Sequence, residues 1–243
     1  MINQNLHKKV VALDRVKHRD LRIDLSARDL TAVNALNAFF VAGTEFTDAC
    51  KEFPVVWVNA GEDEAGKVQV APIAVFGLKE GQNLCTDADG WRVRYVPAVL
   101  RLFPFALARV APTEMVVCFD ESWVGFGTSR GEPLFNAQGE PTEFTLNVQK
   151  QLEHFEGEVE RTRLAGALLQ EKGLLREMRF DADLPDGSKV SVDGFLTVDE
   201  EKLGKLSDAD VLAFHRNGLM GLIHAHQISL GNMARLVQWH AER

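Results

Sequence analysis

Residues 142–172 constrain the fold more than any other part of the chain, because they predict a single long helix. Apolar residues recur there three or four positions apart and so share one helical face; they are Phe144, Val148, Leu152, Phe155 and Val159. Thr142 or Thr145 can cap the start of the helix, and Gly173 ends it. Glutamate and arginine residues cover the outer face, so this helix is expected to cover a core with one side only.

Strands are predicted on both sides of this helix. Residues 55–59 and 68–78 flank an acidic, glycine-bearing segment, a pattern typical of an antiparallel hairpin. Residues 177–183 and 189–198 flank the turn Pro185-Asp186-Gly187, in which proline presets one dihedral angle and glycine accepts a positive one. Shorter strands are expected at 21–25 and 114–119, and a second small hairpin joins 83–85 to 91–93.

The remaining helices are shorter. Ser207 caps a helix that ends at Arg216, Gly218 breaks it, and residues 219–241 predict a terminal helix. Residues 44–51 predict one more short helix, and residues 27–40 are expected to be helical or irregular. We therefore predict an α+β fold with a mainly antiparallel sheet, a long helix near the middle and a C-terminal helix packed on it.

Two segments carry less regular patterns. Apolar residues spaced three and four apart predict a buried helix at 96–108, which Pro104 kinks or divides. Residues 122–141 hold four glycines and two prolines and predict a long loop. No repeat or linker is visible, so we expect a polar lead-in at 1–20 and a single domain at 21–243.

The composition of the chain limits the classes of molecule that it is expected to bind. The formal net charge of −8, from 35 acidic and 27 basic residues, argues against nucleic acid as a partner. Three widely spaced cysteines do not suggest a disulfide framework, and the sequence requires no cofactor. Neither a signal peptide nor an apolar stretch of about 20 residues is visible, so we expect a cytoplasmic protein without a transmembrane segment.

Several blocks of the sequence resemble the SapC family of bacterial proteins. They are WRVRYVPAVLRLFPFALA at 91–108, GEPLF at 131–135, LRID at 21–24, LPDG at 184–187 and IHAH at 223–226. The resemblance covers nearly the whole chain and is distinct from the transporter permease of the same name, which spans membranes. It implies association with a surface layer or envelope, and genes that accompany flavin-dependent halogenase-like proteins and outer-membrane receptors. It carries over no catalytic residue.

Arginine and aromatic residues lie close to one another in the block at 91–108. Arg94, Tyr95 and Arg101 are candidate contacts for a carboxylate or aromatic group of a partner, because guanidinium groups bind both. The alternative is that such arginines pair with acids of the fold, such as Asp24. Arg130 lies in the glycine-rich segment 125–131, where exposed amides can bind an anion; a plain flexible loop is the alternative.

Four of the seven histidines lie in the last 29 residues, which raises the question of a metal site. His215, His224 and His226 are the candidate ligands. His224 and His226 are two positions apart, which places them on different sides of a helix, whereas helical zinc ligands are spaced four apart.

The leading hypothesis is a non-catalytic accessory protein that binds a protein or peptide through the arginine and aromatic block and the loop at 122–141. A metal-dependent enzyme or enzyme subunit acting on a peptide or amino acid is one alternative. A structural component of a surface layer is the other. An oligomer is compatible with each of these hypotheses.

Overall fold

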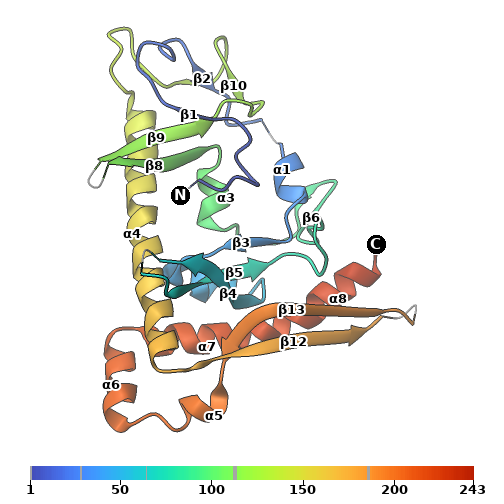
Figure 1. Cartoon of the computed structure of the whole chain (residues 1–243). Helices are drawn as coiled ribbons and strands as arrows, with labels where there is room; N and C mark the ends of the chain where they lie inside the picture. Colours follow the sequence, from blue (N-terminus) through green and yellow to red (C-terminus); the bar gives the residue numbers. More distant parts are fainter. Residues whose placement is uncertain (1, 28, 64, 112–113, 185–186) are drawn as a thin grey trace. The chain divides into compact units, whose positions relative to one another are not determined.

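The structure is a computed structural model that describes residues 2–27, 29–63, 65–111, 114–184 and 187–243 (Figure 1). Its contacts divide the chain into two compact units, each made of two separate stretches of sequence. Unit 1 comprises Met1–Val33 and Val99–Gly157, and unit 2 comprises Asn34–Ala98 and Glu158–Arg243. The expectation that residues 21–243 form one domain remains a prediction.

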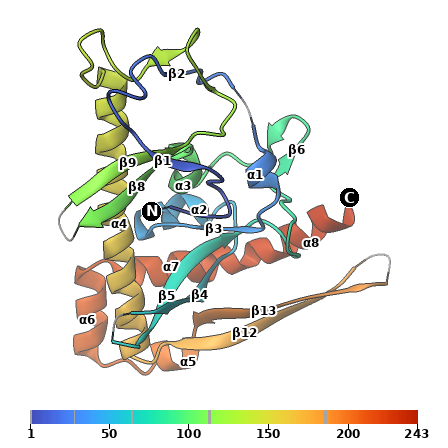
Figure 2. The ribbon, with the colours of Figure 1, turned by 45° about the horizontal axis from the view of Figure 1, so that its top comes forward.

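Unit 1 contains two small antiparallel sheets (Figure 2). The first has the order β1-β9-β8, with the strands Val10–Ala12, Glu114–Asp120 and Phe105–Ala111. The second has the order β10-β2-β11, with the strands Phe126–Gly127, Arg22–Ile23 and Glu132–Pro133. Both neighbours of β2 therefore come from the segment 122–141, which was expected to be a loop throughout.

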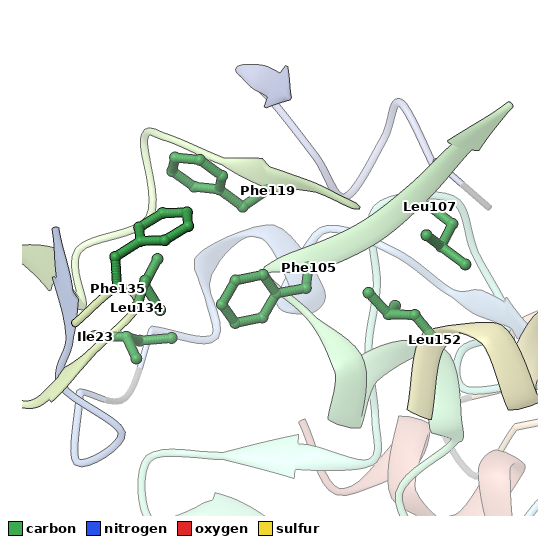
Figure 3. Close-up of a cluster of buried hydrophobic side chains, with 7 residues drawn as sticks. All are labelled: Ile23, Phe105, Leu107, Phe119, Leu134, Phe135 and Leu152. Atoms are coloured by element: carbon green, nitrogen blue, oxygen red, sulfur yellow. The ribbon is translucent and has the colours of Figure 1, made fainter. Parts of the chain in front are cut away.

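An aromatic and aliphatic core lies between these sheets and the first half of the long helix. Figure 3 shows Phe105 between a group that contains Ile23 and Phe135 and a pair formed by Leu107 and Leu152. Phe119 and Leu134 are fully buried in the same cluster. Unit 1 thus has a hydrophobic core of its own.

Helix α4, Glu143–Glu171, is the predicted long helix and is confirmed within one residue at each end. Thr142 caps it, because its hydroxyl accepts the N–H of Thr145 at 3.4 Å. The Thr145 hydroxyl in turn donates to the carbonyl of Leu134 at 2.7 Å, which ties the start of α4 to the core of unit 1. The stretch 143–157 belongs to unit 1 and 158–171 to unit 2.

Unit 2 is built on a five-stranded antiparallel sheet with the order β12-β13-β4-β5-β3. Its strands are Leu175–Asp183, Lys189–Val198, Val55–Glu62, Val68–Val75 and Ala38–Phe40. The two long predicted hairpins, β4-β5 and β12-β13, are confirmed; Pro185 and Asp186 of the second turn lie outside the described residues. The small hairpin, predicted at 83–85 and 91–93, lies closer to its turn and consists of β6, Thr86–Asp87, and β7, Gly90–Trp91.

Short helices complete the fold. They are α1 (Thr31–Asn34), η1 (Gly43–Glu45), α2 (Phe46–Ala49), α3 (Ala98–Leu102), α5 (Glu200–Leu203), α6 (Asp208–Arg216), α7 (Leu219–Ser229), η2 (Leu230–Asn232) and α8 (Met233–Ala241). Ser207 caps α6 as predicted, and Gly218 separates α6 from α7 with a φ of 83°. Helix α7 contacts β4 and β13, so a C-terminal helix does pack on the sheet. Among the described residues, no helix is both long and apolar enough to cross a bilayer.

Three local predictions need correction. The helix expected over 96–108 stops at Leu102, and residues 105–111 form strand β8 instead. Pro104 lacks an N–H and disfavours the helical conformation of the residue before it, while β9 pairs with β8 in continuous register from Phe105 to Arg109. The lead-in at 1–20 contributes strand β1 and the buried residue Leu6, and residues 38–40, expected to be helical or irregular, form β3.

Candidate functional site

A pocket of about 510 Å³ in unit 1 joins the two regions that the sequence marked for binding. The block at 91–108 contributes Arg101 and Phe103, and the segment 122–141 contributes Trp123. Helix α4 supplies Phe144, Asn147, Val148 and Gln151 to the same pocket. Segments far apart in the sequence therefore meet at one concave site of a size typical for ligand binding.

Aromatic rings form the apolar wall of this aromatic pocket. Phe103 and Trp123 meet edge to face with their ring centroids 6.5 Å apart, and Phe105 lies 6.3 Å from Phe144. Phe126 packs behind them, 5.6 Å from Trp123 and 5.8 Å from Phe105. Since Phe103, Trp123 and Phe144 are only partly buried, the rings leave apolar surface open to a ligand.

Polar groups are few in the pocket and have distinct roles. Among the described lining residues, Arg101 is the one charged side chain, and it is exposed on α3. Asn147 and Gln151 are exposed and spaced four apart on α4, so they share one face of that helix. The pocket thus combines an aromatic floor with one cation and two amides that can both donate and accept hydrogen bonds.

Arg130 is exposed in the segment between β10 and β11. The pKa of Asp24 lies below its ordinary value mainly because the Ser26 hydroxyl donates to Asp24 at 2.6 Å, and the charge of Arg130 adds a smaller effect. Arg130 does not line the aromatic pocket in the part of the chain that the structure describes. The segment around it is ordered by strand pairing rather than being a plain loop.

Arg94 and Tyr95 belong to unit 2 and have different environments. Arg94 is exposed. Tyr95 donates its hydroxyl proton to Oε1 of the buried Glu45 at 2.6 Å, and that oxygen also accepts the N–H of Ala98 at 2.7 Å. The second oxygen of Glu45 accepts the N–H of Ala42 at 2.8 Å, so Tyr95 belongs to a structural network.

His226 is fully buried, and both of its ring nitrogens have partners. Nε2 accepts the N–H of Val198 at 3.2 Å and lies 2.9 Å from the hydroxyl of Thr197, so the proton is on Nδ1, which donates to the carbonyl of Val55 at 2.7 Å. Burial lowers the pKa of His226 from 6.5 to about 4, against the opposing effect of the Val55 carbonyl. No lone pair of this neutral ring is left for a metal ion.

His215 and His224 are exposed, on α6 and α7 respectively. His224 lies on a different side of α7 from His226, as the two-residue spacing predicts. Among the residues that the structure describes, no three His, Cys, Asp or Glu side chains gather as a metal site would require. The fold therefore does not bring the three candidate histidines together.

Sequence reasoning identified Arg101 and the segment 122–141 but missed the residues that complete the pocket. Asn147 and Gln151 lie on the outer face of a helix that the sequence described only as charged and solvated. Their spacing of four was a visible signal, but nothing local indicates that β2 and α3 lie beside that face. Arg92, in the same block as Arg101, has the structural role that the sequence left open for these arginines; it lies 4.4 Å above the Trp239 ring and pairs with Glu242 at 3.2 Å.

The family model described as SapC matches residues 13–236, nearly the whole chain. No curated protein and no solved structure matches the chain.

Proposed function

The chain belongs to the SapC family, and on that premise we propose that it is a non-catalytic binding protein that takes up a short peptide segment of a partner protein. The aromatic pocket of unit 1 is the site. The observation that carries this proposal is the meeting of Phe103, Trp123 and Arg101 with two helix-borne amides around one cavity.

The chemistry of the walls favours a peptide over a purely apolar ligand. Aromatic rings bind a large aliphatic or aromatic side chain, because the contact removes much apolar area from water. The rings themselves have few rotamers to lose when they are fixed by the ligand. A peptide also brings backbone donors and acceptors that must be satisfied when water is displaced. Asn147 and Gln151 can serve both kinds of group, and Arg101 favours a carboxylate near the apolar anchor.

A library of random seven-residue peptides displayed on phage is the probe for this proposal. We expect the wild-type protein to enrich peptides that carry one large apolar residue with an acidic residue close by. Trp123→Ala should weaken the best peptide by about tenfold or more, as truncation of a central aromatic contact does. Arg101→Ala should mainly abolish the preference for the acidic residue.

A loss of peptide binding could also come from misfolding of a variant. Asn147→Ala addresses this, because Asn147 is exposed on α4 and its truncation should not disturb the core. It should weaken binding severalfold while leaving thermal unfolding unchanged. Arg109→Ala removes an exposed arginine of β8 that does not line the pocket, and it should bind like the wild type. If no peptide is enriched, or if the enriched peptides bind Trp123→Ala and Asn147→Ala unchanged, the proposal is wrong.

A cytoplasmic location is part of the same proposal. The alternative, a structural component of a surface layer, predicts a different location, since such a component must be found outside the cell. Fractionation of native cells separates the two, and a protein recovered wholly with the envelope would contradict the cytoplasmic location.

A further inference from the structure

A second, polar cavity lies in unit 1, with a volume of about 470 Å³. Strand β2 separates it from the aromatic pocket: Ile23 lines the aromatic pocket, whereas its neighbour Arg22 lines the polar cavity. Adjacent residues of a strand point to opposite faces, which accounts for this division. From the polar cavity we propose that the chain has a binding site for a phosphoryl group, carried by a small phosphate ester or by phosphate itself.

Two arginines supply the positive charge. Arg22 donates from Nε to the carbonyl of Gly131 at 2.9 Å, and Arg19 donates from one terminal nitrogen to the carbonyl of Ala137. A guanidinium has five N–H groups in a planar fork, so each anchoring bond leaves most of the donors available. No carboxylate among the described residues pairs with Arg19 or Arg22.

The backbone that anchors these guanidinium groups is itself fixed. Gly131 has a φ of 92°, and a Cβ at this position would lie 2.0 Å from the carbonyl oxygen of Ile23. Asn136 closes the turn that holds Ala137, because its side-chain oxygen accepts the N–H groups of Gln138 at 2.9 Å and Glu140 at 3.0 Å. Both arginines are therefore positioned before a ligand arrives, which reduces the entropy lost on binding.

The donor set fits a phosphoryl group better than a carboxylate. Arg19, Arg22 and Thr128 line the same cavity, and their two guanidinium forks and one hydroxyl can engage three oxygens, whereas a carboxylate has only two. Asp20 is the one acid among the described lining residues, which leaves a local excess of one positive charge in a chain whose net charge is −8. Pro133 and Phe135 also line the cavity, and its volume leaves room for an organic group on the phosphate.

The test is an NMR titration of the ¹⁵N-labelled full chain at constant ionic strength, with inorganic phosphate in one arm and glycerol phosphate in the other. We expect saturable shifts of the Arg19 and Arg22 side-chain signals in at least one arm, and the tighter probe identifies the source of the phosphoryl group. Acetate at the same ionic strength should give no saturable shift.

Four variants test the assignment. Arg19→Gln, at an exposed arginine, and Arg22→Lys, which keeps the charge but loses the fork, should each weaken binding by about tenfold, the lower end for a hydrogen bond to a charged group. Asp20→Asn should tighten binding about two- to fivefold, since it removes a nearby like charge. Arg176→Gln removes an exposed arginine of β12 in unit 2 and should leave the affinity unchanged. The proposal is overturned if neither probe saturates, or if Arg19→Gln and Arg176→Gln lower the affinity equally.

Discussion

The buried ring of His226 should make the stability of the protein depend on pH in a defined window. Its pKa lies near 6.5 in the unfolded chain and falls to about 4 in the fold. Between these two values the unfolded chain binds the additional proton. The stability contributed by the neutral ring is therefore complete above pH 6.5 and is lost as the pH falls towards 4.

The magnitude follows from the distance between the two pKa values. At about 1.36 kcal/mol per pH unit, the loss from pH 7 to pH 4 is about 3 kcal/mol for this one side chain. This is a large part of the ~5–15 kcal/mol by which a typical domain is stable. The cause is local, because protonation of Nε2 would set an N–H against the N–H of Val198 in a site without water access.

Urea unfolding at intervals between pH 7 and pH 4 measures this effect when the wild type is compared with His226→Asn. The asparagine amide can still donate to the Val55 carbonyl but does not titrate. The variant should be less stable at pH 7, because the buried N–H of Val198 loses its acceptor, at a cost of about 1–3 kcal/mol. As the pH falls to 4, the free energy of unfolding of the wild type should drop by about 3 kcal/mol relative to that of the variant, so that the two values meet or cross.

His224→Asn is the matched control, because it makes the same substitution on an exposed position of the same helix. Its unfolding free energy should follow that of the wild type at every pH. Other groups titrate in this range too, so only the difference between wild type and variant is informative. A constant difference between wild type and His226→Asn from pH 7 to pH 4 would show that the ring is not held neutral by burial.

Two further substitutions test parts of the fold that serve the proposed sites. Gly131→Ala should destabilise unit 1 by about 3 kcal/mol, because it combines a positive φ with a clash against the Ile23 carbonyl. Gly127→Ala, in the same segment but without a neighbour within 4 Å, should change the melting temperature little. Tyr95→Phe should lower the free energy of unfolding by about 1–2 kcal/mol, since Glu45 loses a donor inside the fold; an unchanged urea midpoint would show that this bond contributes nothing.

The sequence predicted those elements whose determinants are local. Helix α4 carries apolar residues three or four positions apart from Phe144 to Val159, and the hairpin β12-β13 has matching strands on either side of a turn. The prediction of a helix over 96–108 was wrong in its second half, because the apolar residues there fit a strand as well as a helix. Only pairing with strand β9 decides between these two structures. Likewise, strand β2 has only two residues, so the apolar pattern of its sequence is too short to predict that it pairs with β10 and β11.

The same distinction applies to the candidate site. Arg101 could be named from its neighbours in the sequence, because arginine among aromatic residues is a local pattern. The amides of Asn147 and Gln151 acquire a role only when α3 and the segment after β9 come to lie beside α4. His226 was a candidate ligand because four of the seven histidines lie in the last 29 residues, and it proved to be a core residue, since Val55 and Val198 reach it from distant strands.

Strand β2 has a consequence for how this chain can vary. Its two residues face opposite ways: Ile23 lines the aromatic pocket, and Arg22 lines the polar cavity together with Arg19. Insertion or deletion of a single residue before Arg22 would exchange the two directions and place a cation against rings and an isoleucine among polar groups. Side chains here can change one at a time, but the length of the segment between Leu21 and Asp24 cannot, so we expect substitutions rather than insertions wherever this segment differs between related chains.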